Sequence, residues 1–136
     1  MLEYEITAEV TPPDDAAAKV REYEIKFDAT SSLIANNLPN PSELLLTSLA
    51  ACILKNVQRY SERLHLPYRK AVIYVIGKRN DNPPFMSEIT YKLEIDTDVE
   101  RRKLVVWHKN ILKFGTITNT LIRACKLEGT IDYLKG

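Results

Sequence analysis

One apolar segment constrains the fold of this chain more than any other feature: Leu44–Leu54 reads LLLTSLAACIL and is apolar on almost every side. Asn40 is a good N-cap before it, Pro41 suits the first helical position, and Glu43 stands at the spacing of a capping box. The pattern predicts a helix from Asn40 to about Leu64, where a proline follows soon after. A helix that is apolar all round belongs in the interior of a structure.

The composition is that of an ordinary globular chain. Its 136 residues, 45% of them hydrophobic and 27% charged, fit one domain, which is expected to span residues 1–136. A net charge of +1 gives no sign that nucleic acid or a membrane surface is a partner. Leu44–Leu54 is too short to cross a bilayer and no signal peptide is visible, so a cytoplasmic location is expected.

The remaining hydrophobic pattern predicts two β-hairpins. Glu3–Val10 and Val20–Phe27 alternate with the strand period and are expected to pair around a proline-containing turn at residues 11–15. Lys70–Lys78 and Glu88–Ile95 are expected to form the second hairpin. Between the first hairpin and the long helix, Ala29–Asn40 is interpreted as a loop or a short third strand.

The C-terminal third is expected to hold two helices and a closing strand. Thr97 or Asp98 is a candidate cap for a helix that ends near Leu112, and Thr116–Cys125 is interpreted as a short helix. Leu127–Leu134 is the expected closing strand. This order of elements predicts the α+β class, with an antiparallel sheet packed on the long central helix.

Two segments resemble the motifs of a known family. Asn40–Leu46, followed by Ala50-Ala51-Cys52, resembles the motif around the peroxidatic cysteine of the OsmC-like proteins, which include organic hydroperoxide reductases. Lys113–Leu121 resembles the second motif of that family. The resemblance implies a single OsmC-like domain and an intertwined homodimer with its long helices at the centre. Such a dimer would bury a helix that is apolar on every side.

The resemblance also implies peroxide reduction by a pair of thiols, the first oxidised to a sulfenic acid and the second condensing with it to a disulfide. Cys52 falls at the place of the first thiol. Glu43 is the candidate carboxylate, although in the hydroperoxide reductase branch the acid stands at the position of Ser42. The second thiol falls at Gly115, and the turn after the first strand holds no arginine. Two parts of the family's centre are therefore absent.

Each candidate residue also has a structural interpretation. Cys52 is either a reactive thiol or a small buried hydrophobe, and Glu43 is either a catalytic carboxylate or half of a capping box. Cys125 is interpreted as a packed thiol, which would reach Cys52 only with their α-carbons within about 7 Å. Trp107 belongs to a helical apolar stripe and is expected in the core, with the wall of a ligand pocket as the alternative.

The function expected from these observations is thiol-dependent reduction of hydroperoxides, including organic ones, with Cys52 and Glu43 as catalytic residues. The alternative is a non-catalytic module that binds a small hydrophobic ligand at the dimer interface. A third possibility is a one-cysteine enzyme or sensor whose sulfenic acid is resolved by an external thiol reductant. His65 and His108 have no partners at ligand spacing, so neither a metal nor a cofactor is expected.

Overall fold

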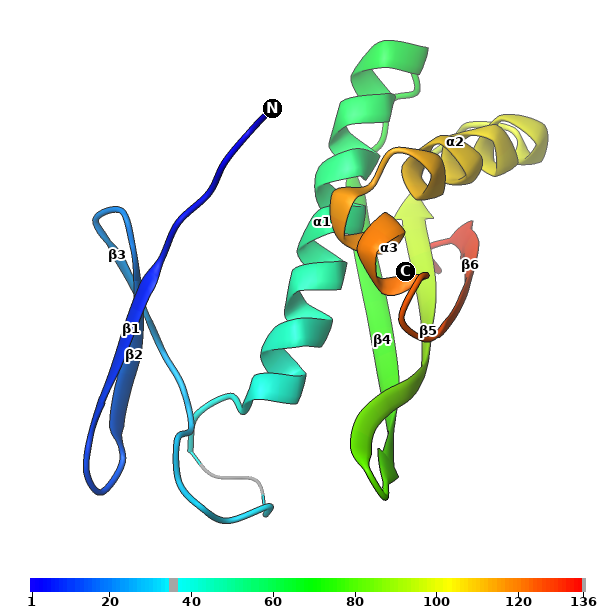
Figure 1. Ribbon diagram of the computed structural model, residues 1–136. Helices are drawn as coiled ribbons and strands as arrows, with labels where there is room; N and C mark the ends of the chain where they lie inside the picture. The colour runs from blue at the N-terminus through cyan, green and yellow to red at the C-terminus, as the bar shows by residue number, and fades with distance from the viewer. Residues whose placement is uncertain (35–36, 136) are drawn as a thin grey trace. The chain divides into compact units, whose positions relative to one another are not determined.

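The computed structural model describes residues 1–34 and 37–135 of the chain (Figure 1). They form two compact units, residues 1–45 and residues 46–136. The elements are, in order, β1 (Thr7–Thr11), β2 (Asp15–Val20), β3 (Tyr23–Lys26), α1 (Pro41–Leu64), β4 (Lys70–Asp81), β5 (Pro84–Asp96), α2 (Arg101–Lys113), α3 (Thr116–Leu121) and β6 (Lys126–Tyr133). The α+β class expected from the sequence is confirmed.

The first unit holds an antiparallel sheet of order β1-β2-β3. The prediction that Glu3–Val10 pairs directly with Val20–Phe27 is wrong, because β2 lies between the two segments and pairs with both. The strand was missed because its Ala16–Ala18 run has no large apolar residue to mark an alternation. β2 and β3 join through a two-residue turn in which Arg21 has a positive φ of 57°.

One face of this first sheet is apolar and largely uncovered. Six side chains lie on the same face because of the strand registers, which pair Val10 with Ala16, Ala18 with Ile25 and Val20 with Tyr23. Val10, Tyr23 and Ile25 keep 55%, 59% and 45% of their surface exposed. A three-stranded sheet needs a covered apolar face for stability, so this one calls for a further layer.

The long helix begins as the sequence predicts. Asn40 Oδ1 accepts a hydrogen bond from the Glu43 backbone N–H at 2.8 Å, and Glu43 Oε1 accepts one from the Asn40 N–H at 3.0 Å, which completes a capping box. α1 ends at Leu64, also as predicted, and His65 follows with a positive φ of 56°. In the segment before the helix, the described residues form no strand, and Ala35 and Asn36 lie outside the described residues.

The second unit holds a sheet of order β4-β5-β6. The predicted hairpin of β4 and β5 is present, with strands that extend to Asp81 and Pro84 and leave a turn of only Asn82 and Pro83. β4 and β5 pair in the expected antiparallel manner, but β6 pairs in parallel with β5, so this sheet is mixed. A parallel pair requires a crossover connection, and α2 and α3 provide it. α3 stops at Leu121, four residues before the end expected from the sequence.

The core of the second unit lies between this sheet and the helices that cover one of its faces. The fully buried side chains come from α1, α2 and β5 and are Leu49, Ile53, Val57, Ile89, Leu93, Ile95, Leu104, Trp107 and Ile111. Trp107 is therefore a core residue, as expected, and its indole N–H donates to the Val57 carbonyl at 3.2 Å. Asn56 Nδ2 donates to the Ile111 carbonyl at 3.4 Å, so polar contacts also join α1 to α2.

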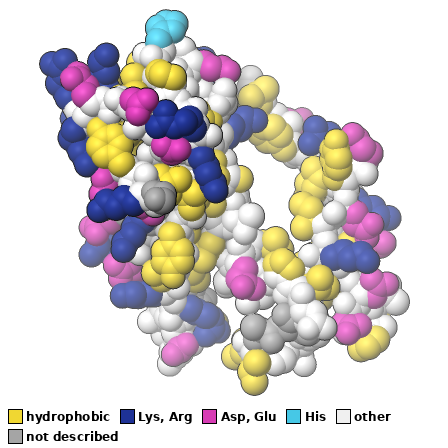
Figure 2. Space-filling model, turned by 180° about the vertical axis from the view of Figure 1, so that it is seen from behind, with side chains coloured by type: hydrophobic (Ala, Val, Ile, Leu, Met, Phe, Trp, Pro, Cys, Tyr) yellow, Lys and Arg dark blue, Asp and Glu magenta, His cyan; other side chains and the backbone are white. Residues whose placement is uncertain are grey.

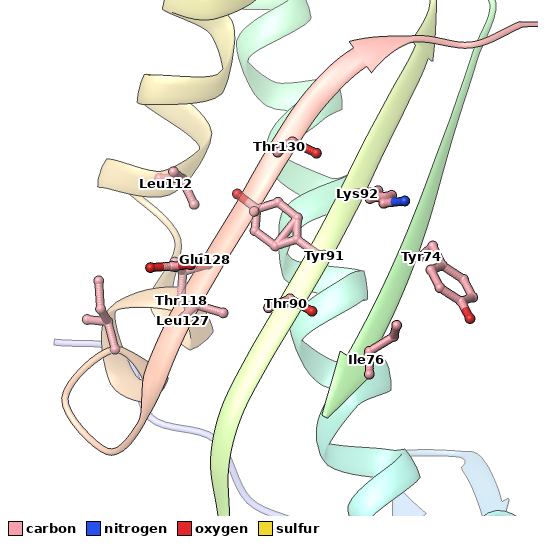
Figure 3. A pocket seen from close by; sticks show the side chains of 12 residues that line it. Tyr74, Ile76, Thr90, Tyr91, Lys92, Leu112, Thr118, Leu127, Glu128 and Thr130 are labelled. Carbon is pink, nitrogen blue, oxygen red and sulfur yellow. The ribbon is translucent and has the colours of Figure 1, made fainter. Parts of the chain in front are cut away.

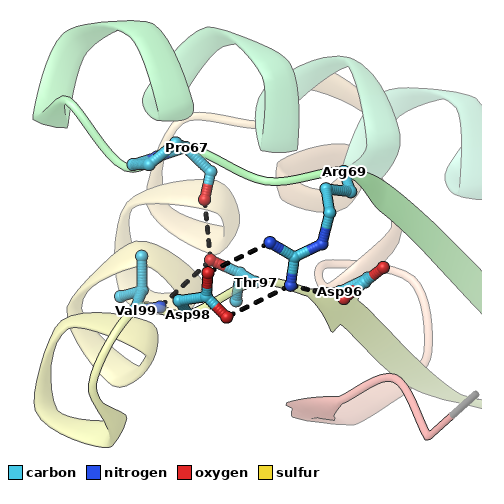
Figure 4. Close-up of polar contacts among 6 residues, drawn as sticks. All are labelled: Pro67, Arg69, Asp96, Thr97, Asp98 and Val99. Atoms are coloured by element: carbon cyan, nitrogen blue, oxygen red, sulfur yellow. Dashed lines mark hydrogen bonds and ion pairs between the residues drawn. The ribbon is translucent and has the colours of Figure 1, made fainter.

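The start of α2 differs from the prediction. Neither Thr97 nor Asp98 caps the helix, whose N-cap is Glu100 without a side-chain cap bond. Thr97 Oγ1 instead donates to the Pro67 carbonyl at 2.7 Å, and Asp98 binds the guanidinium of Arg69 at 3.1 Å (Figure 4). Both side chains thus join the end of β5 to the segment after α1, and that contact competes with capping.

The opposite face of the second sheet is open and partly apolar. Val72, Tyr74 and Ile76 alternate along β4 and keep 37%, 63% and 45% of their surface exposed. Figure 2 shows hydrophobic side chains on this side of the unit, surrounded by charged ones. Within residues 1–34 and 37–135, no helix is both long and apolar enough to cross a membrane.

Candidate functional site

The sulfur of Cys52 faces the end of the α2–α3 connection. Cys52 is half-buried at the middle of α1, one residue before the fully buried Ile53. A Cβ atom built on Gly115 would lie 3.2 Å from Cys52 Sγ. The structure therefore brings together the two positions that the family resemblance assigns to the two thiols, and one of them carries no side chain.

Gly115 is held in place by the elements on either side of it. It is the N-cap of α3, and its carbonyl accepts the Asn119 N–H at 2.9 Å. Asn119 Nδ2 donates to the Lys113 carbonyl at 3.1 Å, which ties α3 to the end of α2. The Phe114 ring stacks on Tyr60 of α1 at 5.8 Å between centroids. This packing fixes the connection against the helix that carries Cys52.

The side chain of Thr118 points to the same place. Thr118, in the first turns of α3, is 2% exposed, and its Oγ1 would lie 2.8 Å from the Cβ built on Gly115. Among the described residues, Thr118 Oγ1 is the buried side-chain polar atom without a hydrogen-bond partner. Buried hydroxyl groups nearly always have a hydrogen-bond partner. The Thr118 hydroxyl therefore marks a position where a bound polar atom would be stabilised.

Thr118 also lines a hollow of about 630 Å³ in the second unit (Figure 3). Most of the wall is apolar, with Leu112, Ile122 and Leu127 near Thr118 and with Tyr74 and Ile76 from β4. The volume lies in the range of small-molecule sites, which are typically apolar with a few polar groups.

Tyr91 and His108 form a buried polar pair beside this hollow. Tyr91 Oη and His108 Nε2 are 2.6 Å apart in a hydrogen bond, and the tyrosine ring lies against Gly129. Burial raises the pKa of the Tyr91 hydroxyl above its ordinary value and lowers the pKa of His108 below 6.5. The pair is therefore neutral near pH 7, and it joins β5 to α2.

The other predicted residues have structural contacts. Glu43 is half of the capping box of α1. Cys125 is half-buried and free, and its thiol donates to the Leu121 carbonyl at 3.6 Å. In the described parts of the chain, no three His, Cys, Asp or Glu residues converge as a metal site would require. Sequence reasoning missed Thr118, although it belongs to the segment that resembles the second family motif.

Comparison with known proteins agrees with this arrangement. The sequence model of the OsmC-like protein family matches residues 34–129, which include both Cys52 and Gly115. The chain belongs to the OsmC-like family. A comparison with curated proteins finds no match for this member of the family.

Solved structures of OsmC-like proteins share the fold over nearly the whole chain. An OsmC-like protein from Mycoplasma pneumoniae is 22% identical, with a TM-score of 0.87 over 98% of this chain and 99% of its own. An organic hydroperoxide resistance protein from Legionella pneumophila is 10% identical, with a TM-score of 0.78 over 97% and 99%. Another from Elizabethkingia anophelis is 12% identical, with a TM-score of 0.73 over 98% and 99%. At these identities the likeness establishes the fold alone.

Proposed function

We propose that this OsmC-like protein reduces organic hydroperoxides with Cys52 as its only catalytic thiol and an external thiol as the reductant. The observation that carries the proposal is the position of Gly115 against the Cys52 sulfur. The two-thiol chemistry implied by the family would place its second sulfur there. Because glycine offers none, the first product has to be resolved from outside the chain.

The proposed reaction has three balanced steps. The Cys52 thiolate attacks one peroxide oxygen, the O–O bond breaks, and the departing alkoxide takes up a proton to leave as an alcohol. An external thiol then attacks the sulfenic acid sulfur, which forms a mixed disulfide and releases water. A second external thiol attacks the mixed disulfide, releases a small-molecule disulfide and restores the Cys52 thiol.

Glu43 is assigned a structural role in this proposal. Its carboxylate accepts the Asn40 N–H and so holds the first turn of α1. Cys125 takes no part either, because its sulfur is packed against the Leu121 carbonyl, beyond the last turn of α3. Peroxide reduction therefore requires only the Cys52 side chain, so a single substitution tests the proposal.

The decisive measurement is consumption of cumene hydroperoxide by the purified protein with a monothiol, a dithiol and a thioredoxin system as alternative reductants. We expect turnover with at least one of them, abolished in Cys52→Ser and retained in Cys125→Ser. Equal peroxide loss in wild type and Cys52→Ser would refute the proposal.

A second candidate function is supported by the apolar hollow of about 630 Å³. In that case the protein binds a small hydrophobic molecule without chemistry at Cys52. The discriminating observation is retention of an apolar fluorescent probe by Cys52→Ser together with absence of turnover in the wild type. Cys52 is not among the residues that line the hollow, so binding in the hollow and chemistry at the thiol can be measured separately.

A further inference from the structure

The Thr118 hydroxyl differs from that of Thr120 in the same helix, which makes a hydrogen bond. Thr120 Oγ1 donates to the Thr116 carbonyl at 2.8 Å, the usual bond of a helical threonine to the preceding turn. Thr118 Oγ1 has no such partner among the described residues although it is more deeply buried. Burying a hydroxyl without a hydrogen bond costs free energy of folding. The simplest explanation is a binding site in which a polar group of a bound species pairs with Thr118.

The position of that polar group is bounded by Gly115, the Cys52 sulfur and the Thr118 hydroxyl. The Cβ that Gly115 lacks would be 3.2 Å from Cys52 Sγ and 2.8 Å from Thr118 Oγ1. An oxygen bonded to the sulfur is much closer to Sγ than the missing Cβ would be, so it would lie between Sγ and the position of that Cβ. Thr118 Oγ1 borders the same space and has no other partner in the described part of the chain, so its hydroxyl is the donor that such an oxygen would meet.

We propose that Gly115 and Thr118 form a niche for the oxygen that peroxide transfers to Cys52, with the Thr118 hydroxyl as hydrogen-bond donor to that oxygen. The proposal rests on the proposed function, since the oxygen arrives when the thiolate breaks the O–O bond and an alcohol leaves. Thr118 Oγ1 and Cβ lie 2.8 and 3.2 Å from the position that a Cβ on Gly115 would take, so the Thr118 side chain borders the niche.

This niche lengthens the life of the sulfenic acid. Further oxidation requires a second peroxide to add another oxygen to the same sulfur, which yields a sulfinic acid and an alcohol. The hydrogen bond from Thr118 stabilises the singly oxidised form and so slows that further oxidation. A persistent sulfenic acid is the state that a one-cysteine mechanism needs while it waits for an external thiol.

The test uses Cys125→Ser protein, so that Cys52 is the one thiol observed. The sulfenic acid is formed with one equivalent of cumene hydroperoxide, then exposed to a fixed excess and trapped at intervals with dimedone for intact mass spectrometry. We expect Thr118→Val to lose dimedone reactivity about fivefold faster, the effect of one hydrogen bond. Thr118→Ser keeps the hydroxyl and its hydrogen bond, so its rate should stay within about twofold of the parent.

Thr120→Val is the matched control, because it removes the same hydroxyl from the same helix two residues away. Thermal unfolding of each variant shows whether the fold is kept. Equal sulfenic acid lifetimes in the parent and Thr118→Val would overturn the niche while leaving the peroxidase proposal intact. So would the same loss in Thr118→Ser, or in Thr120→Val. If the parent itself forms no dimedone adduct, the proposed function fails and the niche fails with it.

Discussion

The α-carbon of Gly115 faces the sulfur of Cys52, and a Cβ added to it would lie 3.2 Å from Sγ. In a disulfide, the Cβ of one cysteine lies about 3 Å from the other sulfur, given standard bond lengths. Gly115→Cys is therefore expected to restore an intramolecular disulfide with Cys52 after peroxide treatment. Intact mass spectrometry should show the loss of about two mass units, reversed by a dithiol.

Thr118 Oγ1 must rotate away for the new cysteine to fit, since it would lie 2.8 Å from the added Cβ. Gly115→Cys/Thr118→Ala removes that conflict and should form the disulfide at least as completely. Gly115→Ala is the control and should form none. Wild-type protein should also form none, and a Cys52–Cys125 link in its peptide map would contradict this prediction and give Cys125 the resolving role.

A dimer is expected because the first sheet leaves its apolar face exposed and the central helix is apolar on nearly every side. Sedimentation should show a dimer at micromolar concentration. Ile25→Lys places a charge on the apolar face and should shift the equilibrium toward monomer. Glu24→Lys changes the neighbouring residue, which points to the opposite face, and should leave the dimer unchanged. A well-folded wild-type monomer would refute the prediction.

The Tyr91–His108 pair predicts how stability depends on pH. Burial lowers the pKa of His108 below 6.5, so under acid the unfolded chain binds a proton that the folded chain does not. The free energy of unfolding should therefore fall as pH drops below about 6.5, toward the depressed pKa of the folded state. Burial raises the pKa of Tyr91 above 10.0, so stability should also fall above that pH, where the unfolded tyrosine ionises first.

Urea unfolding at several pH values measures this effect. His108→Gln should flatten the dependence between pH 5 and 7, the region about the ordinary pKa of histidine. His65→Gln, at an exposed position after α1, serves as the control and should retain the wild-type slope. An unchanged slope in His108→Gln would show that another group controls stability in this range.

Gly129 is expected to resist substitution. A Cβ there would overlap the ring of Tyr91, which is held by its hydrogen bond to His108. Gly129→Ala should destabilise the protein by about 1–3 kcal/mol, the usual range for overpacking. Gly77→Ala is the comparison, because there the close atoms are the terminal methyls of Met86 and Leu46, which are ends of flexible side chains and can turn aside. If chemical denaturation gives equal losses for both, the Tyr91 ring is not fixed as described.

The capping box separates two roles for Glu43. Asn40→Ala should cost about 1 kcal/mol of stability, typical for loss of an N-cap side chain. Glu43→Gln keeps an oxygen acceptor for the Asn40 N–H but removes the charge, so both stability and peroxide turnover should change little. A large fall in turnover with Glu43→Gln, at unchanged stability, would give the carboxylate a catalytic role.

The elements with strong local signals were predictable from the sequence. Asn40 and Glu43 mark the start of α1 by hydrogen bonds that residues three apart can make, and β4 and β5 show a regular alternation. The middle of β2 is the alanine run Ala16–Ala18, which shows no alternation. The parallel pairing of β6 depends on the path of a connection, which no local feature of residues 126–133 reveals.

The candidate site shows the same division. The family motifs identified Cys52 and the position of Gly115, but not the distance between them. Thr118 escaped notice because a threonine in a short helix is an ordinary surface residue by sequence. Its burial and its lack of a partner arise from the packing of α3 against the rest of the unit. In the same way, Asp98 has the residue type of a helix cap, but contact with a distant arginine determines its role.

The parallel pairing of β5 with β6 also sets a sequence of events during folding. Gly115 and Thr118 lie on the crossover between these strands, and such pairings form slowly because a long loop must close before any contact compensates for its entropy. α1, in contrast, is built from local contacts. A newly made chain therefore acquires the Cys52 helix before the niche beside it. The lifetime of the Cys52 sulfenic acid should consequently report on completion of the fold, because a protein arrested before β6 docks lacks the niche that protects this acid.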